Sequence, residues 1–332
     1  MQGQFLISSF QRTVFVLLVC CLIYADEKID IPGPEQRTLD FTYQLTAKAL
    51  PGGDAEAMAW VPIPPSNKQQ TVHSFQINSD YSYRIVTEPE YGNAFFMFDL
   101  STARGDTTVS VTFRVTRNAF SVRNGDPGTE TGPTEMKRFL VSDNLVPIVG
   151  KIMKEAKRVV GKSNGQLATS RRLYDHIVNS LSYDKSGKGW GLGDANYACD
   201  VRKGNCTDFH SLFIGEARSM KIPSRFVMGF PIPEDKEGTV GGYHCWAEFF
   251  VEDMGWMPID ASEASKHPEK KEAFFGGLDA NRIQFTLGRD IQVPNSDVNP
   301  VNYFIYPHVE VNGNKYEKVE RLFSYKEIDK KS

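Results

Sequence analysis

Short runs in which apolar and polar residues alternate dominate the first third of the chain. The clearest is TLDFTYQLTA at 38–47, where Leu39, Phe41, Tyr43 and Leu45 fall on one face, as in a half-buried β-strand. Turn-rich pieces such as LPGGD separate it from five further runs. These runs are AMAWVPI at 57–63, TVHSFQI at 71–77, YRIV at 83–86, NAFFMFDL at 93–100 and TTVSVTFRV at 107–115. Many short strands without intervening helices predict a small antiparallel β-sandwich domain over residues 37–121.

The pattern changes after a polar segment rich in glycine and proline, and we interpret residues 122–135 as a linker. Helical spacing of apolar residues then predicts helices over 145–161, over 166–181 and from residue 206 to about 220. Strand-like pieces follow, at 224–232, 242–251, 255–260, 302–311 and 315–325. The last two are expected to pair as a C-terminal hairpin across Asn312-Gly313. Helices followed by strands predict an α+β unit over residues 136–332.

The N-terminus has the pattern of a secretory leader. The apolar run TVFVLLVCCLIYA at 13–25 has the length of a signal-peptide core and ends in a small residue, Ala25. We expect a signal peptide over 1–25, a polar linker over 26–36, and an exported protein, periplasmic or extracellular. A lipid anchor at Cys20 or Cys21 and an uncleaved anchor helix stay open as alternatives, and only these would bring the protein to a membrane.

Composition narrows the function further. The chain has 332 residues, 40% hydrophobic and 24% charged, which is typical of a globular protein. A formal net charge of −3 and the lack of a basic tract argue against a nucleic-acid partner. Without the leader, Cys199, Cys206 and Cys245 remain, too few for a disulfide framework. A bridge between Cys199 and Cys245 would leave Cys206 as the free thiol.

One of these cysteines stands where a nucleophile is wanted. In GNCTDFHSLF, Asn205 is a good N-cap and Asp208 suits the first turn, so Cys206 begins the third helix on its inward face. The helix dipole there lowers a thiol pKa, and free backbone N–H groups can hold an oxyanion. The alternative is a buried structural cysteine.

A thiol nucleophile needs a base and a group that orients the base. His244 lies on the alternating strand GYHCWAEFF, and Asp260 ends the next strand, GWMPID. If the hairpin turn centres near residue 252 or 253, the two side chains fall opposite or diagonal on one face. The alternatives are a core histidine and a turn aspartate.

Other residues near these motifs are weaker candidates. Trp190, Tyr183 and Trp246 are candidates for lining a substrate cleft or for supporting an oxyanion, although core packing is the commoner use of such aromatic residues. Cys206 and His210 share a helix face, but the spacing to Cys199 does not fit the close cysteine pairs of structural zinc sites. We therefore expect neither a metal nor a cofactor.

Taken together, GNCTDFHSLF, IPSRFVMGF, GYHCWAEFF and GWMPIDAS resemble the transglutaminase-like superfamily in order and spacing. The resemblance covers roughly 163–291 and implies a papain-like core with a catalytic triad. In it Cys206 attacks a carbonyl, His244 transfers the proton, and Asp260 holds the histidine. A cysteine beside the histidine, Cys245, departs from the small residue usual there.

The resemblance leaves three functions to compare. An exported cysteine hydrolase, of the protease or amidase type and acting on protein or peptide substrates through a thioacyl intermediate, is our first hypothesis. Transfer of the acyl group to an amine, as in cross-linking enzymes, uses the same chemistry. A non-catalytic binding or scaffold protein that keeps the fold is the third. The oligomeric state does not follow from the sequence.

Overall fold

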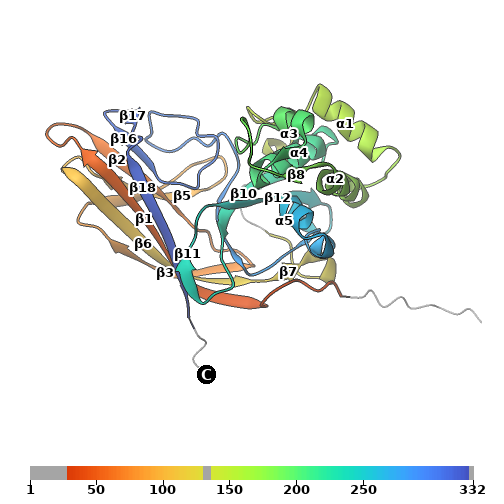
Figure 1. Ribbon diagram of the computed structural model, residues 1–332, viewed down its shortest axis with the longest axis horizontal. Helices are drawn as coiled ribbons and strands as arrows, with labels where there is room; N and C mark the ends of the chain where they lie inside the picture. The colour runs from red at the N-terminus through yellow and green to blue at the C-terminus, as the bar shows by residue number, and fades with distance from the viewer. Residues whose placement is uncertain (1–27, 130–135, 329–332) are drawn as a thin grey trace, which may run out of the picture.

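A computed structural model describes residues 28–129 and 136–328, so the predicted signal peptide lies outside the described residues. Figure 1 shows a strand-rich part beside a part in which helices cover a smaller sheet. The strands of the first part are β1 (Gln36–Leu50), β2 (Ala57–Ile63), β3 (Gln70–Asn78), β4 (Tyr83–Thr87), β5 (Ala94–Asp99), β6 (Gly105–Asn118), β11 (Glu237–Thr239), β16 (His308–Val311), β17 (Asn314–Lys315) and β18 (Val319–Glu327). They form two five-stranded sheets, β11-β18-β1-β6-β3 and β17-β16-β2-β5-β4.

The alternation in the sequence determines which face of these strands is buried. Leu39, Phe41, Tyr43 and Leu45 of β1 are fully buried, as their spacing predicted. The six runs predicted as strands all appear as β1 to β6, and they pair with one another in antiparallel fashion. All six predicted strands are therefore present, but the two sheets also contain β11, β16, β17 and β18, so the sandwich extends beyond residues 37–121.

The predicted C-terminal hairpin across Asn312-Gly313 is present but short: β16 pairs antiparallel with β17 only from Glu310 with Lys315 to Val311 with Asn314. On its other edge β16 pairs with β2, and β18 leaves the hairpin to pair with β1 along nine residue positions. The end of the chain thus returns to complete both sheets of the sandwich. Local pattern predicted the strands, but only the three-dimensional fold shows that their partners lie some 250 residues earlier.

The second part holds a four-stranded sheet of order β13-β12-β10-β15. Its strands are β10 (Ser224–Pro231), β12 (His244–Val251), β13 (Gly255–Ile259) and β15 (Arg282–Leu287). The helices are α1 (Lys151–Val160), α2 (Gln166–Ser180), α3 (Ala195–Val201), α4 (Cys206–Ser219) and α5 (Ala261–Lys266). Two small pairs complete the fold: β7 (Phe120–Ser121) with β14 (Gly277–Leu278), and β8 (Ser182–Tyr183) with β9 (Lys203–Gly204). Single turns of 3₁₀-helix lie at η1 (Val122–Asn124), η2 (Met136–Leu140) and η3 (Pro268–Lys270).

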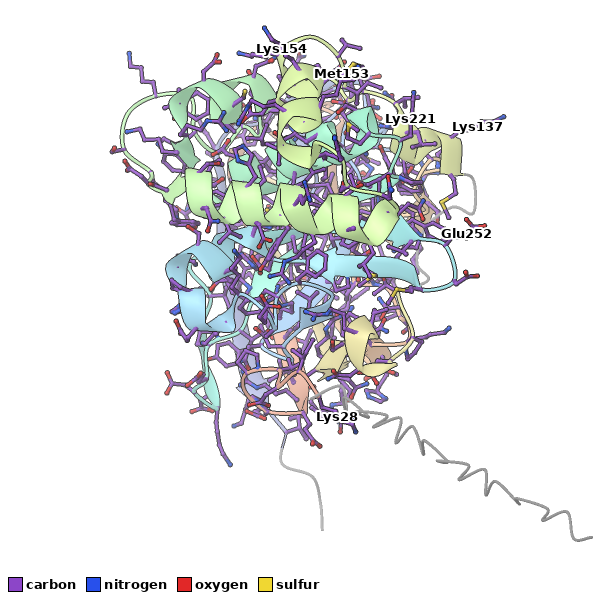
Figure 2. All side chains as sticks on the ribbon, turned by 90° about the vertical axis from the view of Figure 1, so that its right-hand side faces the viewer. Lys28, Lys137, Met153, Lys154, Lys221 and Glu252 are labelled. Atoms are coloured by element: carbon purple, nitrogen blue, oxygen red, sulfur yellow. The ribbon has the colours of Figure 1, made fainter. Side chains whose placement is uncertain are left out.

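Helix α4 is the centre of this second part, because every one of its residues is buried. Helices α1, α2 and α3 pack around it on one side and the strands β10 and β12 on the other. Figure 2 looks onto the helical side, where Lys154 of α1 and Lys221 lie at the periphery. No helix in the described part of the chain has both the length and the apolar character needed to cross a bilayer.

The two parts share one aromatic core. Phe230 of β10 lies 5.1 Å, between ring centroids, from Phe41 of β1 and 4.4 Å from Phe323 of β18. Phe285 of β15 packs edge-on against Phe113 of β6 at 5.9 Å. The sheet of the second part therefore packs directly against the sandwich.

The segment predicted as a linker is packed at both ends of its described part, at Val122 and at 128–129, whereas most of the residues between are exposed. Thr129 is buried, forms a bridge with Trp256 and accepts a hydrogen bond from Arg225. Gly128 lies so close to the backbone of Trp256 that a Cβ would stand 2.7 Å from its carbonyl oxygen. The polar, glycine-rich composition here reflects close contact with a neighbouring strand rather than a free connection.

Candidate active site

Cys206 begins α4, as its sequence context predicted. The Asn205 side chain accepts the N–H of Thr207, and Asp208 accepts the N–H of Asn205 at 2.9 Å, which together make the expected capping box. Asp208 also accepts the N–H groups of Gly191 and Gly193, at 2.7 and 3.1 Å. The first turn of the helix, and with it the thiol, is held by both its own cap and the preceding loop.

The hairpin brings His244 to Asp260 in the predicted way. Strands β12 and β13 pair from Val251 with Gly255 to Ala247 with Ile259, so the turn centres on residue 253. Asp260 follows directly and lies diagonal to His244 on the same face. The distance from His244 Nε2 to Asp260 Oδ2 is 2.6 Å. This contact leaves Nδ1 as the ring nitrogen that faces Cys206.

The charges of the three groups favour an ion pair. Burial acts to lower the pKa of His244, but the charge of Asp260 and the contact with Cys206 raise it to about 10. Burial acts to raise the pKa of Cys206, but hydrogen bonds from Cys245 and His244 bring it well below its ordinary value. Burial likewise opposes the ionisation of Asp260, and His244 and Arg282 outweigh it, so its pKa is well below the usual range. These directions favour a thiolate, an imidazolium and a carboxylate at neutral pH.

Asp260 is positioned by more than the histidine. Its Oδ2 also accepts a hydrogen bond from Arg282 Nη1 at 2.8 Å, and its Oδ1 accepts from Ser262 and from the N–H of Glu263 as the cap of α5. Arg282 is itself buried and forms a second ion pair with Asp279. The sequence reading missed this role of Arg282, because nothing in the local pattern of β15 indicates that its first residue reaches the end of β13.

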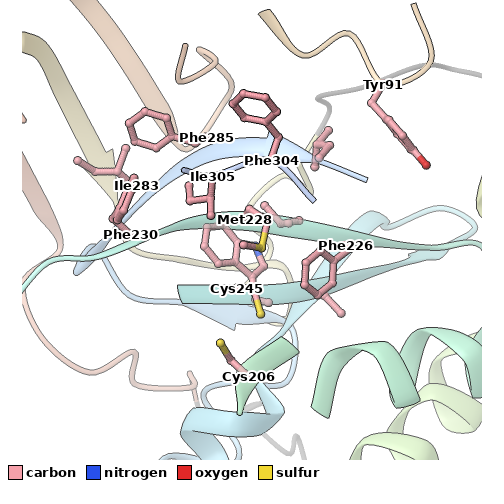
Figure 3. Close-up of a cluster of buried hydrophobic side chains, with 14 of the residues drawn as sticks. Tyr91, Cys206, Phe226, Met228, Phe230, Cys245, Ile283, Phe285, Phe304 and Ile305 are labelled. Carbon is pink, nitrogen blue, oxygen red and sulfur yellow. The ribbon is translucent and has the colours of Figure 1, made fainter. Parts of the chain in front are cut away.

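Two more buried groups surround the thiol. Cys245 contacts Cys206, and Figure 3 shows the two sulfur atoms facing each other from β12 and α4. His210 Nε2 accepts the N–H of Ala261 at 3.1 Å, and burial lowers the His210 pKa to about 4. His210 is therefore neutral and holds the backbone that follows Asp260.

The possible bridge between Cys199 and Cys245 does not form, because all three described cysteines are free. Cys199 lies on α3, where its Sγ donates a hydrogen bond to Glu155 at 2.8 Å. Cys245 instead lies beside Thr207 and His210, with its Sγ 3.8 Å from the Thr207 hydroxyl. Cys199 therefore contacts α1 and Cys245 contacts α4, a difference that the linear sequence does not show.

The weaker candidates fall in different places. Tyr183 lies near the thiol, because its β8 strand pairs with β9 just before Cys206, and its ring packs against Phe209. Trp190 is half-buried, and the residue after it, Gly191, donates its backbone N–H to Asp208. Trp246 is fully buried, and the Arg282 guanidinium lies over its indole ring at 5.3 Å.

Tyr243 is a site residue that the sequence reading overlooked. Its hydroxyl lies 2.8 Å from Thr207 Oγ1 and 3.0 Å from Asn205 Nδ2, on the two neighbours of Cys206. The side-chain amide of Asn205 is buried and donates its hydrogen bond to this tyrosine hydroxyl. His244 also lines a pocket of about 240 Å³, together with Pro231, Phe274 and Arg282 among others. Only 2% of Cys206 is exposed, and it is not among the residues that line this pocket.

Comparison with known proteins identifies this part of the chain. Residues 154–261, which contain the three groups, match the family model of the transglutaminase-like superfamily. They form a transglutaminase-like domain. The fold and the family expected from the sequence are thereby confirmed. Strand β15, which lies beyond residue 261, belongs to the same four-stranded sheet as β10, β12 and β13.

Similarity to whole proteins extends beyond the transglutaminase-like domain. An uncharacterized protein of Haemophilus influenzae is 25% identical over 363 positions, covering 96% of this chain and 98% of that protein. A solved structure of a candidate cysteine protease from Cytophaga hutchinsonii aligns with a TM-score of 0.51 and 16% identity, over 88% of this chain and 99% of that one. At that identity the likeness concerns the fold alone. The periplasmic domain of TgpA from Pseudomonas aeruginosa aligns at a TM-score of 0.36 and 15% identity, over 70% of this chain and 90% of that one, too low to support an argument.

Proposed function

We propose that the protein is a cysteine hydrolase that cleaves amide bonds in protein or peptide substrates. The observation that carries the proposal is the buried chain of contacts from Cys206 to His244 and from His244 Nε2 to Asp260 Oδ2 at 2.6 Å. Such a chain supplies the nucleophile, the proton carrier and the group that orients the carrier. The family match supports a thiol enzyme in general, and the choice of reaction is our own inference.

The reaction begins with the thiolate of Cys206. It attacks the carbonyl carbon of the amide. The new oxyanion is placed to accept a hydrogen bond from the backbone N–H of Cys206, because the N–H of Thr207 is already bound to the Asn205 side chain. The C–N bond then breaks, and the imidazolium of His244 gives its proton to the departing amine. A thioester remains. Water, deprotonated by the neutral imidazole, attacks the thioester; the C–S bond then breaks, the carboxylic acid leaves, and the thiolate of Cys206 and the imidazolium of His244 are restored.

Asp260 keeps the imidazole in one orientation during both steps. With Oδ2 shared between His244 and Arg282, its carboxylate stabilises the imidazolium without taking up the proton. The aspartate cannot turn away, because its other oxygen caps α5.

The alkylation rate of Cys206 against pH tests the ion pair, with His244→Ala as the comparison. We expect a rate that reaches its plateau well below the free-cysteine pKa of about 8.5, and the loss of that plateau in the variant. If the rate in both proteins keeps rising until the pH approaches the free-cysteine pKa, the hydrolase proposal is refuted. Because Cys199 and Cys245 also carry thiols, the alkylated residue must be identified by peptide mapping.

A product assay then decides between hydrolysis and transfer. A peptide amide is incubated with and without a primary amine, and the products are weighed by mass spectrometry. Hydrolysis yields the carboxylic acid in both reactions. Formation of the new amide at the expense of the acid would assign an acyltransferase instead.

We also propose that the protein is exported. The support is the apolar run at 13–25 with its small terminal residue. Cell fractionation of the full chain, with a chain lacking residues 2–25 as the comparison, tests it. Equal cytoplasmic retention of both chains would contradict export.

A further inference from the structure

A second cluster of chemically active side chains lies where three helices meet, apart from the active site. Glu155 of α1, His176 of α2 and Glu216 of α4 each offer a ligand atom, and these atoms all lie within 4.8 Å of one another. Figure 1 shows the helices α1 to α4 gathered on this side of the molecule. The cluster joins residues that no local sequence pattern connects.

Two members of the cluster are already in contact. His176 Nε2 lies 2.7 Å from Glu155 Oε1, and the other Glu155 oxygen accepts the thiol of Cys199 at 2.8 Å. Arg202 also donates to Glu155 Oε1. The position and orientation of the Glu155 carboxylate are therefore determined by three side chains, one from α2, one from α3 and one from the residue that caps α3.

Glu216 is different, because its carboxyl group is fully buried and has no hydrogen-bond partner for either oxygen within the described part of the chain. The other ionisable groups of α4 are all satisfied. Asp208 accepts three N–H groups, and Arg218 pairs with Asp143 at 2.7 Å. A buried polar group without a partner costs free energy, and a second carboxylate beside it adds to that cost.

A cation between the two carboxylates would remove this cost. Arg202 and Arg158 place positive groups beside Glu155, Arg158 at 3.5 Å, but neither forms an ion pair with Glu216, and one third of the Arg202 side chain is exposed. Two carboxylate oxygens and an imidazole nitrogen make a donor set suited to a first-row divalent ion such as Zn²⁺. His176 and Arg202 are partly exposed, so an ion can reach the cluster from the outer side of the bundle.

We propose that Glu155, His176 and Glu216 form a binding site for a divalent transition-metal ion of the zinc type. Such an ion would tie α1 and α2 to the helix that carries the nucleophile. Glu216 lies ten residues after Cys206 on α4, which is about 15 Å along the axis, so the ion stabilises the helix bundle and takes no part in the attack. The expectation of no metal, based on cysteine spacing alone, did not consider residues from separate helices.

Zn²⁺ titration of the full chain tests the site. Because Zn²⁺ would also bind a thiolate beside a histidine, every protein carries Cys206→Ser, which removes that competing site and makes the test independent of the proposed hydrolase. The chains are first freed of metal with a chelator. Isothermal titration then gives the stoichiometry, and thermal unfolding gives the shift on adding Zn²⁺.

Three further variants in the same background assign the ions. Glu216→Gln keeps the shape of the side chain but removes its charge, and His176→Gln removes the ligand that is partly exposed and least needed for folding. Glu234→Gln changes an exposed glutamate outside the cluster and serves as the control.

We expect one Zn²⁺ per chain and a higher unfolding temperature with Zn²⁺ in the Cys206→Ser protein and in the control. Affinity should fall by at least about tenfold in both ligand variants, since even groups that only support a ligand contribute that much. Absence of saturable binding, or equal binding by Glu216→Gln and the control, would overturn the proposal. If Glu216→Gln fails to fold, His176→Gln decides the question by the same comparison.

Discussion

Replacing Asp260 by asparagine tests how the site maintains its ion pair. Asparagine has nearly the same shape, so it can still approach His244, but it carries no charge. The pKa of His244 lies at about 10 instead of its ordinary 6.5 because Asp260 and Cys206 together outweigh burial. That difference corresponds to on the order of 5 kcal/mol in favour of the imidazolium.

Asp260 is the largest of the contributions that raise this pKa. Without its charge, burial acts on the histidine with less opposition, and the imidazolium loses most of its advantage at neutral pH. The thiolate of Cys206 then loses its counter-ion. We expect the pH midpoint of Cys206 alkylation to move upward by at least about one unit, the equivalent of about 1.4 kcal/mol.

The assay is iodoacetamide alkylation across pH 4 to 10, roughly the range that brackets the two groups, together with an NMR titration of the His244 ring. Asp54→Asn, an exposed aspartate in the sandwich, is the control for the loss of one negative charge. A His244 pKa that stays near 10 in Asp260→Asn would refute the reasoning, because the histidine would then owe its charge to something other than the aspartate.

Three other outcomes are expected. Cys245→Ala removes a hydrogen bond that lowers the pKa of Cys206. Because hydrogen bonds to charged groups are worth about 1.5–3 kcal/mol, the pH midpoint of Cys206 alkylation should rise by roughly one to two units. An unchanged midpoint would contradict the contact between the two cysteines. Substrate turnover should decline at high pH as His244 deprotonates. Because the pKa of His244 is raised in the folded protein, the histidine contributes its full stabilisation below pH 6.5 and loses it as the pH passes about 10. Urea midpoints measured across that range, with His244→Ala as the comparison, test this pH dependence. Phe230→Ala should cost about 3–5 kcal/mol of unfolding free energy, because the ring is fully buried between Phe41 and Phe323, and a loss below 1 kcal/mol by urea denaturation would argue against a shared core.

Local pattern in the sequence was sufficient for β1 to β6, for α2 and α4 and for the contact between His244 and Asp260, but it did not predict α3, α5 or β15. The alternation of β1 and the helical spacing of α2 depend only on which neighbours face the same way, and that is visible in the chain itself. The approach of His244 to Asp260 was predictable for a similar reason, since a tight hairpin links two nearby strands and its turn sets the register. The start of α4 at Cys206 followed from its cap.

Contacts between distant segments were decided by the tertiary structure alone. The pairing of β18 with β1, the ion pair of Arg282 with Asp260, and the meeting of Glu155 with Glu216 join positions that no spacing rule connects. The segment at 122–129 looked like a linker because glycine and polar residues are common in loops, yet here the same residues permit close packing against Trp256. Sequence pattern reports which side of an element is buried, whereas the partner on that side is determined by how all the elements fit together in one core.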